Sequence, residues 1–464
     1  MQPHLTWTLK AQILACSLLF ASAVCAQSSD GDRIKALEQK FNQSLGLIEQ
    51  LQKRIAELEQ RQPSPAALVG TNITHPATTH IVNGTTPVHA RVDNTRVDNL
   101  EAAVANMANS LSKSPTDVGL QLHGFMDAGY ARASGNAPAY DKSGFRLGTF
   151  DIYLTPQFGD RVKGLVELAF EYGPDGVLAT DLERLQIGYV VSDQMTLWAG
   201  RFHAPLGYWN TAFHHGAQIQ TSITRPRFIG FEDQGGVLPV HTVGLWVTGK
   251  FDTRLGRVNY DAYAGNSASL RDGNLNYNAA GYDQQEPAVG FNLGLSPAAL
   301  PGLTFGLHGV QHKVNSTVAG AGNNGLVNLQ VLGGYAFLET NQWEVIAEYY
   351  QFNNTDLLGS AGTNTSSASF VQAAYQFQDR WTGFSRYEKA VLNASDPYFS
   401  LMNSDGAGNN YTTRFGSSYT QYTLGLRYDL DPRSAIKIQA EQIVDEGNAS
   451  RPVNWFRAQY SLRF

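Results

Sequence analysis

The sequence predicts an all-β transmembrane barrel of about 16 antiparallel strands, preceded by an α-helical coiled coil. Three observations support this fold class: an N-terminal secretion signal, a series of amphipathic segments whose connections are short and long in turn, and a final segment that alternates strictly up to Phe464. The final segment alone would equally suit a half-buried strand of a soluble sandwich. Together, the three observations favour a barrel in an outer membrane.

Residues 1–26 are expected to form a signal peptide. Lys10 precedes an apolar run over 13–24, and small residues follow that suit cleavage after Ala26. Lipid attachment at Cys16 is less favoured, because cleavage there would leave almost no apolar core. Both cysteines, Cys16 and Cys25, lie inside this segment, so the exported chain would have no disulfide, thiol nucleophile or thiolate metal ligand.

Composition favours a membrane barrel over a helical membrane protein or a soluble domain. Charged residues make up 16% of the chain, below the roughly 25% typical of soluble domains. The mean hydropathy is -0.26, and after the signal no apolar run approaches the roughly 18 residues of a spanning helix. The net charge of -6 is mild and gives no sign of a basic nucleic-acid surface. Few charges and many aromatic residues suit a lipid-facing band, so outer-membrane lipid is the expected environment.

Apolar residues recur with a heptad period over 32–62, which predicts a periplasmic coiled coil. The two seam positions hold Ile34, Phe41, Ile48 and Ile55, and Leu37, Ser44, Leu51 and Leu58. Leu45 and Leu47 widen the seam, which favours a trimer, although four heptads do not decide between dimer and trimer. A single amphipathic helix lying on its own barrel is the alternative.

A flexible linker is expected over 63–90. Pro63 and Pro65 end the coiled coil, and the residues that follow are mostly Thr, Pro, Asn, Gly and His, which cannot bury a core. A short helix is expected over 91–114, since apolar residues recur three and four apart until Pro115 stops the pattern. This helix would either extend the stalk or dock at the barrel mouth.

The barrel is expected over 118–464. Strands are predicted near 118–131, 145–158, 161–172, 182–191, 195–203, 241–251, 256–264, 287–295, 302–314, 326–338, 342–352, 367–378, 380–390, 419–430, 434–445 and 454–464. Tight turns alternate with longer connections rich in Gly, Asn and Ser. This alternation is typical of outer-membrane barrels and is not expected of a β-sandwich. Boundary shifts of about two to four residues leave 14 or 18 strands open.

Charged residues gather on one face of these strands. In the third strand Lys163 and Glu167 lie opposite the apolar face, and Arg427 and Arg457 do so in two later strands. A lysine or arginine on the lipid face would cost about 2–4 kcal/mol at mid-bilayer, so this face is expected to line a polar lumen.

The longest connection, 204–240, is the third on the long-loop side. Its length and its own aromatic residues indicate a folded, functional loop. The loop position, strand number, signal peptide and terminal Phe464 together resemble the trimeric outer-membrane diffusion porins, nearest to the phosphate-selective porin group and the porins with an N-terminal coiled coil. This resemblance implies a homotrimer that passes small hydrophilic solutes, with the third loop folded into the lumen as the constriction. It also implies that Phe464 is the signal read by the barrel assembly machinery.

Charged residues around this loop are the candidate constriction. The cations are Arg201, Arg225, Arg227 and Lys250, opposed by Glu232 and Asp233. A charged constriction biases ions, and weak anion selectivity is the preferred interpretation. Alternatively, the arginines pair with loop acids and hold the fold. A phosphate-specific role is not favoured, because acids are also expected on the inner face: Asp127, Asp151, Glu344, Glu348 and Glu441.

No metal, other cofactor or enzymatic activity is expected. Histidines occur around the loop at His203, His214, His215 and His241, but adjacent histidines have divergent side chains and no carboxylate stands at a metal-site spacing. No Gly-x-Ser-x-Gly elbow marks a nucleophile. The rival function is structural, with the barrel as an anchor and the coiled coil linking the outer membrane to the cell wall.

Overall fold

A computed structural model describes residues 122–134, 143–172, 178–213, 216–232, 236–271, 274–276, 286–316, 325–359, 361–402, 416–445 and 452–464. The predicted signal peptide, coiled coil, linker and short helix lie outside these residues, as do His214, His215 and Asp233.

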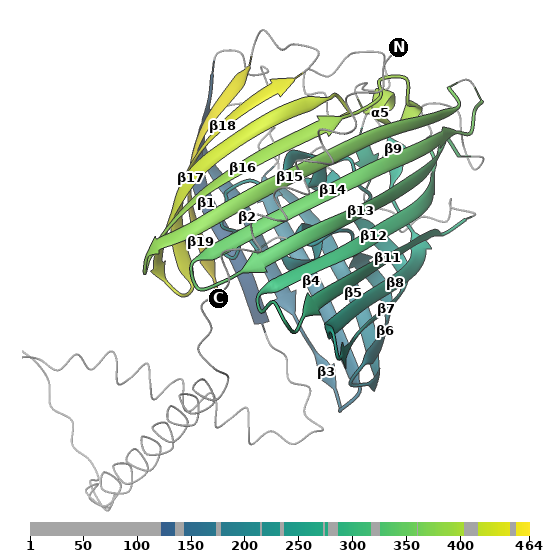
Figure 1. Cartoon of the computed structure of the whole chain (residues 1–464), viewed down its shortest axis with the longest axis horizontal. Helices are drawn as coiled ribbons and strands as arrows, with labels where there is room; N and C mark the ends of the chain where they lie inside the picture. Colours follow the sequence, from purple (N-terminus) through teal and green to yellow (C-terminus); the bar gives the residue numbers. More distant parts are fainter. Residues whose placement is uncertain are drawn as a thin grey trace, which may run out of the picture. The chain divides into compact units, whose positions relative to one another are not determined.

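Antiparallel strands close into a barrel of the predicted fold class (Figure 1). The first half of the wall comprises β1 (Leu122–Ala133), β2 (Gly144–Leu154), β3 (Gln157–Phe158), β4 (Val162–Tyr172), β5 (Leu178–Ser192), β6 (Met195–His203), β7 (His241–Thr253) and β8 (Gly256–Asn266). The second half comprises β11 (Ala288–Pro297), β12 (Leu303–Val314), β13 (Val327–Glu339), β14 (Trp343–Asp356), β15 (Thr363–Gln378), β16 (Trp381–Val391), β17 (Tyr419–Asp431), β18 (Ser434–Asp445) and β19 (Val453–Arg463). The sheet has 17 segments, and because β3 merely continues β2 along β4, 16 strands form the wall.

One expected strand is interrupted. The predicted strand over 145–158 divides into β2 and β3 at Thr155 and Pro156. Proline has no N–H to donate to a ladder, which accounts for the break. The carbonyl of Pro156 still accepts a hydrogen bond from Gly164 N at 2.7 Å, so β4 spans the interruption.

The last strand closes the barrel on the first. β19 pairs antiparallel with β1, from Phe125 opposite Arg463 to Ala133 opposite Trp455. At the end of the ladder, Gly124 N donates to Phe464 O at 3.1 Å and Phe464 N donates to Gly124 O at 3.0 Å. A side chain at position 124 would collide with the Phe464 ring, since a Cβ there would lie 2.2 Å from it.

The two rims of the barrel differ as the sequence predicts. The short-turn rim joins strands through 159–161, 193–194, 254–255, 298–302, 340–342, 379–380 and 432–433. The loop rim, at the top of Figure 1, has longer connections that include α4 (Trp209–Ala212), η1 (Arg227–Ile229), α5 (Pro397–Leu401) and the small hairpin of β9 (Ser269–Arg271) and β10 (Asn274–Asn276). Loop 204–240 is the third connection of this rim. Within the described ranges, no helix is long and apolar enough to cross a membrane.

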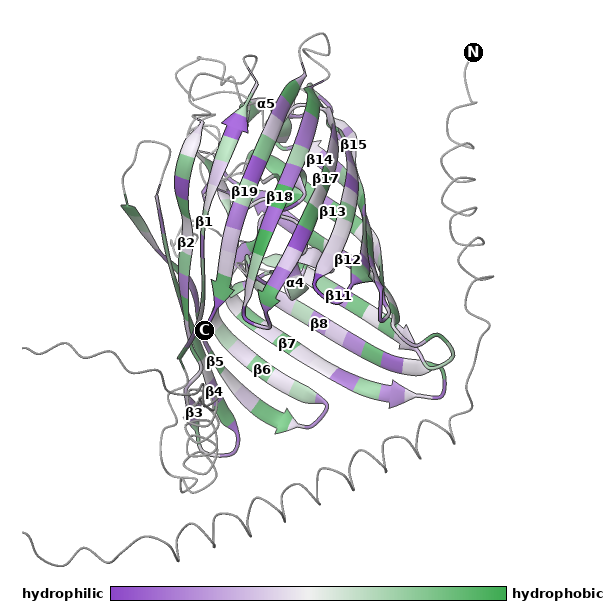
Figure 2. Ribbon diagram, turned by 90° about the vertical axis from the view of Figure 1, so that its left-hand side faces the viewer, coloured by the Kyte–Doolittle hydropathy of each residue, from purple (hydrophilic) through white to green (hydrophobic). Residues whose placement is uncertain are grey.

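Hydrophobic and hydrophilic residues alternate along the wall strands (Figure 2), and their exposure indicates that the hydrophobic ones face outward. On the outside, Leu424 is 66% exposed and Phe456 is 48% exposed. On the inside, Lys437, Gln439 and Ser461 are buried. Outward apolar exposure together with inward polar burial is the arrangement of a lipid-embedded barrel with a filled or lined lumen.

Candidate functional site

Loop 204–240 folds into the barrel rather than over it. Loop N–H and hydroxyl groups donate hydrogen bonds to inward-facing side chains of β14, β16 and β18. The donors and acceptors are Trp209 N and Glu348 Oε1 (2.7 Å), Thr221 Oγ1 and Glu344 Oε1 (2.8 Å), Ile223 N and Gln439 Oε1 (2.8 Å), Thr224 Oγ1 and Glu441 Oε1 (2.8 Å), and Arg227 N and Glu388 Oε2 (2.6 Å). The loop leaves β6 and returns to β7, and β6 stands halfway around the ring of strands from β16. The loop therefore crosses the lumen, as the resemblance implied.

Aromatic packing fixes two parts of the loop, at α4 and at η1. Trp209 is buried, with its ring edge-on to Phe370 at 5.6 Å between centroids. Phe228 is buried against Tyr350 at 5.3 Å. Such pairs add to the stability that burying their apolar area already provides. The lumen at the level of the loop is thus packed on the side of β14 and β15.

Gly207 sets the direction in which the loop enters. It has φ +75°, and a Cβ at this position would lie 2.0 Å from Tyr350 Oη and 2.1 Å from Glu348 Oε2. Glycine is required here both for its backbone conformation and for the close approach to the wall. The tight turn lets Glu348 reach the N–H of Trp209.

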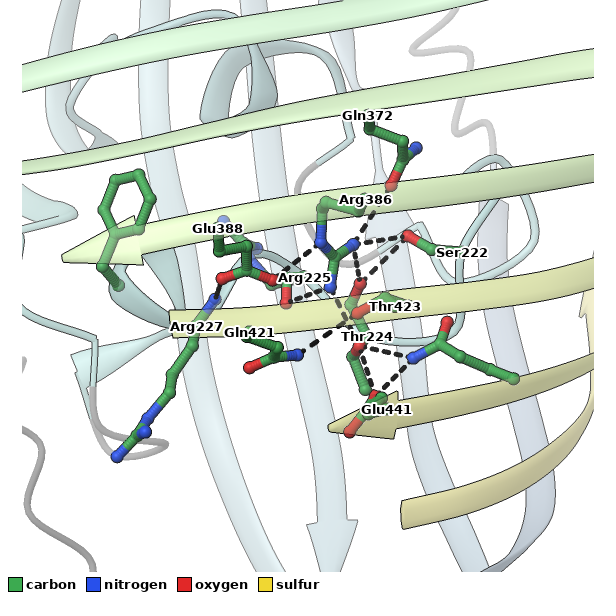
Figure 3. A network of polar contacts seen from close by, with 12 residues as sticks. Ser222, Thr224, Arg225, Arg227, Gln372, Arg386, Glu388, Gln421, Thr423 and Glu441 are labelled. Atoms are coloured by element: carbon green, nitrogen blue, oxygen red, sulfur yellow. Dashed lines mark hydrogen bonds and ion pairs between the residues drawn. The ribbon is translucent and has the colours of Figure 1, made fainter. Parts of the chain in front are cut away.

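Arg386 of β16 is the centre of the network that holds the loop (Figure 3). Its side chain is fully buried beside Glu388, with Nε 2.7 Å from Glu388 Oε1. The guanidinium donates to Thr224 O at 2.8 Å, Ser222 Oγ at 3.0 Å and Arg225 O at 3.1 Å. Glu388 accepts the N–H of Arg227, so the two wall residues together hold the loop between Ser222 and Arg227.

Two more wall cations bind loop carbonyls. Arg427 donates to Gln218 O at 2.7 Å and to Gln220 O at 2.9 Å, and it also pairs with Asp429. Lys437 donates to the carbonyls of Ala217 and Ser222. Through these contacts the Arg427 side chain holds the loop on the inner side of the wall.

The predicted loop arginines differ from each other. Arg225 donates to Ile229 O at 3.1 Å and to the side-chain oxygen of Asn210, and its guanidinium lies 4.0 Å from the Phe231 ring centroid. Burial lowers the pKa of Arg225 to about 10, so the side chain stays charged at neutral pH. Arg227 is partly exposed, lies over the Tyr419 ring at 4.6 Å and extends away from the Arg386 network (Figure 3).

Arg201 and Glu232 lie at the base of the loop. Arg201 is buried and donates to Glu183 O at 3.1 Å. Glu232 is fully buried and accepts hydrogen bonds from Val240 N at 2.7 Å and His241 N at 2.9 Å. Burial acts to raise the pKa of Glu232, but His241 and the backbone donors outweigh it and hold this pKa below its ordinary value. Glu232 thus fixes the returning end of the loop at the start of β7, whereas Arg201 joins β6 to β5.

Four other predicted lumen residues are on wall strands, at different levels of the barrel. Lys250 is on β7 nine residues beyond His241, about 30 Å along the strand at 3.3 Å per residue, so the expectation that it lies near the loop arginines is wrong. Lys163 is also exposed toward the short-turn rim. Glu167 is buried and bonded to Arg184, and Arg457 donates to Glu441 Oε1 at 3.1 Å.

The sequence prediction omitted several residues that hold the loop: Glu183, Arg386, Glu388, Lys437 and Gln439. Two-residue alternation places the last four on the inner faces of β16 and β18, and this signal was available in the sequence. Their contacts with a loop more than 150 residues earlier in the chain were not available from any local pattern.

Comparisons with known proteins identify the fold. No family model and no curated protein matches the sequence. The barrel is similar to the anion-selective porin from Comamonas acidovorans, with a TM-score of 0.51 and 14% identity over 75% of this chain and 100% of that chain. The outer membrane channel DcaP of Acinetobacter baumannii is also similar, with a TM-score of 0.49 and 12% identity over 76% of this chain and 99% of that chain. Membership of the phosphate-selective group stays a prediction, whereas the described part of the chain has the porin fold.

Proposed function

We propose that this protein is an outer-membrane channel through which small hydrophilic solutes diffuse passively. The observation that carries the proposal is the position of loop 204–240, which crosses the lumen of a closed barrel and is fixed to one wall by buried polar bonds. Barrels of 16 strands are at the size where an aqueous channel begins. A barrel that served only as an anchor would have no need of a positioned constriction.

The inner face toward the short-turn rim supports a hydrated vestibule. His123, Lys163 and Lys250 are exposed there and lie on the inward faces of β1, β4 and β7. Charged side chains keep such a surface wet. Solutes would pass from the narrow level of the loop into this wider, cationic end.

Weak anion selectivity is the finer part of the proposal, and it rests on Arg227. Both loop arginines are partly exposed, but Arg225 bonds to Ile229 O and Asn210 of the loop, whereas the side chain of Arg227 extends away from the Arg386 network. A fixed cation at a narrow, low-dielectric level raises the local anion concentration. The many acids of the inner wall limit the effect, and most of them bond to the loop or to arginines.

The proposal includes the assembly that the sequence predicts. A homotrimer would carry the coiled coil 32–62 in the periplasm, and the barrel assembly machinery would read Phe464. The contacts of Phe464 support this role, since its backbone closes the ladder to Gly124 and its ring stacks on Phe150 at 5.9 Å. A terminal residue without an aromatic ring would leave the closing strand without the contact to Phe150.

Liposome swelling tests the channel. Vesicles that contain the full-length folded protein are expected to swell in isotonic sugar solutions, with rates that fall as the sugar becomes larger. Folded protein that gives no swelling with the smallest sugar would support the structural alternative, in which the barrel is a sealed anchor.

Reversal potentials in a KCl gradient test the selectivity. Arg227→Ala is expected to shift the permeability ratio toward K⁺, because it removes a partly exposed cation of the constriction. Arg257→Ala is the matched control, since Arg257 pairs with Asp252 in an exposed position at the short-turn rim. An unchanged ratio for Arg227→Ala would refute the assignment.

A further inference from the structure

Two histidines and a glutamate form a row across three neighbouring strands. The register of β6 and β7 pairs His203 with His241. Leu185 of β5 pairs with Arg201 of β6, so Glu183, two residues before Leu185, stands beside His203, two residues after Arg201. The row lies where loop 204–240 leaves β6 and returns to β7.

The three side chains converge on one another. His241 Nε2 lies 2.5 Å from Glu183 Oε2, and His203 Nε2 lies 3.5 Å from the same oxygen. One ligand atom from each residue lies within 4.8 Å of those of the other two, and all three residues are buried. Among the residues that the structure describes, this is the one group of three or more His, Cys, Asp and Glu with such geometry.

A second carboxylate orients one of the histidines. Glu232 Oε2 lies 2.9 Å from His241 Nδ1, and Glu232 is itself fixed by the N–H groups of Val240 and His241. A proton on Nδ1 directed at Glu232 leaves the Nε2 lone pair pointing at Glu183 and His203. A carboxylate behind a histidine in this way is the usual outer partner of a metal-bound imidazole.

We propose that Glu183, His203 and His241 bind a divalent transition-metal ion such as Zn²⁺, with Glu232 as a positioning residue. Two imidazoles and one carboxylate suit this class of ion, with bonds of about 2.0–2.2 Å and a water molecule in the fourth position. Ligand atoms of a tetrahedral site stand about 3.3 Å apart at such bond lengths, between the 2.5 and 3.5 Å separations observed. The ion would join β5, β6 and β7 at the base of the loop, whether or not the channel is open.

The competing arrangement needs no metal. His241 lies between Glu183 and Glu232, so a protonated imidazole bonded to both carboxylates would also hold the base of the loop. The two arrangements differ in what they predict for His203, which a metal requires as a ligand and the proton-based arrangement does not.

Equilibrium dialysis with Zn²⁺ distinguishes them. Untagged, folded full-length protein, stripped with EDTA, is expected to bind one more equivalent of Zn²⁺ than His203→Gln or Glu183→Gln. Glu232→Gln should keep that equivalent with an affinity about 10–100-fold lower. His123→Gln, which removes an exposed histidine of β1, is the matched control and should bind as the wild type does. Zn²⁺ should raise the unfolding temperature of the wild type and leave that of His203→Gln unchanged.

Equal Zn²⁺ binding by the wild type and by folded His203→Gln would overturn the proposal. Folding is checked by the heat-dependent mobility of the barrel in gel electrophoresis. Should the strand variants fail to fold, the proposal is tested by replacing His75, His80, His89, His214 and His215 with Gln, since these histidines lie in the expected linker and in the loop and could bind Zn²⁺ elsewhere. One equivalent retained by that variant supports the site, and none retained refutes it.

Discussion

Replacing Arg386 with methionine should release loop 204–240 from the wall while the barrel stays closed. Methionine keeps much of the side-chain volume but removes every donor. Glu388 would then remain buried without its cation, and the carbonyls of Thr224 and Arg225 would lose their donor. The strand ladders of β16 are made by backbone groups and are untouched.

The expected magnitude follows from the burial of this pair. Both side chains are 0% exposed, and removing one partner of a buried ion pair costs about 3–5 kcal/mol. At about 1.4 kcal/mol for each factor of ten, the ratio of docked to released loop falls by roughly two to four powers of ten. The double variant Arg386→Met with Glu388→Gln should recover part of this loss, because it leaves no buried charge unpaired.

Limited proteolysis and single-channel recording provide the readouts. In Arg386→Met we expect faster cleavage within the loop and a larger, noisier conductance, with both changes smaller in the double variant. Arg257→Met, in the exposed pair at the short-turn rim, should resemble the wild type. Wild-type cleavage and conductance in Arg386→Met would show that the network does not position the loop.

Three further predictions concern the wall, the entrance of the loop and its base. Leu424→Arg places a cation on the lipid face and should destabilise the barrel by about 2–4 kcal/mol in denaturant titrations in lipid, whereas Leu255→Arg, on an exposed short turn, should be neutral. Gly207→Ala should accelerate loop proteolysis and cost more than about 1 kcal/mol, because its φ of +75° and its contacts with the wall exclude a Cβ. In Glu232→Gln, with EDTA present, the unfolding midpoint should fall below the wild-type value at pH 6. Because folding lowers the pKa of Glu232 from its ordinary 4.5, its stabilisation is present above that value and lost as pH falls through the folded-state pKa. The two midpoints should therefore converge in acid.

The fold could be predicted from the sequence because lipid imposes a simple rule on every strand. Each wall residue faces either lipid or the lumen, so the alternation around Leu424 or Phe456 is readable without knowledge of any partner. The same rule placed Arg427 on the inner face. The rule does not predict where a strand is interrupted. The alternation of the predicted strand 145–158 continues on both sides of Pro156, but this residue has no N–H and the strand is divided there into β2 and β3.

The contacts of the loop could not be predicted in the same way. Alternation indicates that Arg386 faces inward, but its partner Thr224 lies 162 residues away, and no local pattern relates them. The histidines show the same limit, because spacing along the chain separates His203 from His241 by the whole loop, whereas strand register sets them side by side. Glu183 completes the group from a third strand, so only the fold reveals it.

The conductance of the purified full-length protein in planar bilayers tests the central claim most directly. We expect discrete conductance steps from the wild type, and larger steps from a variant in which residues 208–234 are replaced by a short Gly-Ser linker, since the loop occupies the lumen. Folded wild-type protein that inserts into the bilayer and gives no steps would contradict the account, as would equal steps from the two proteins.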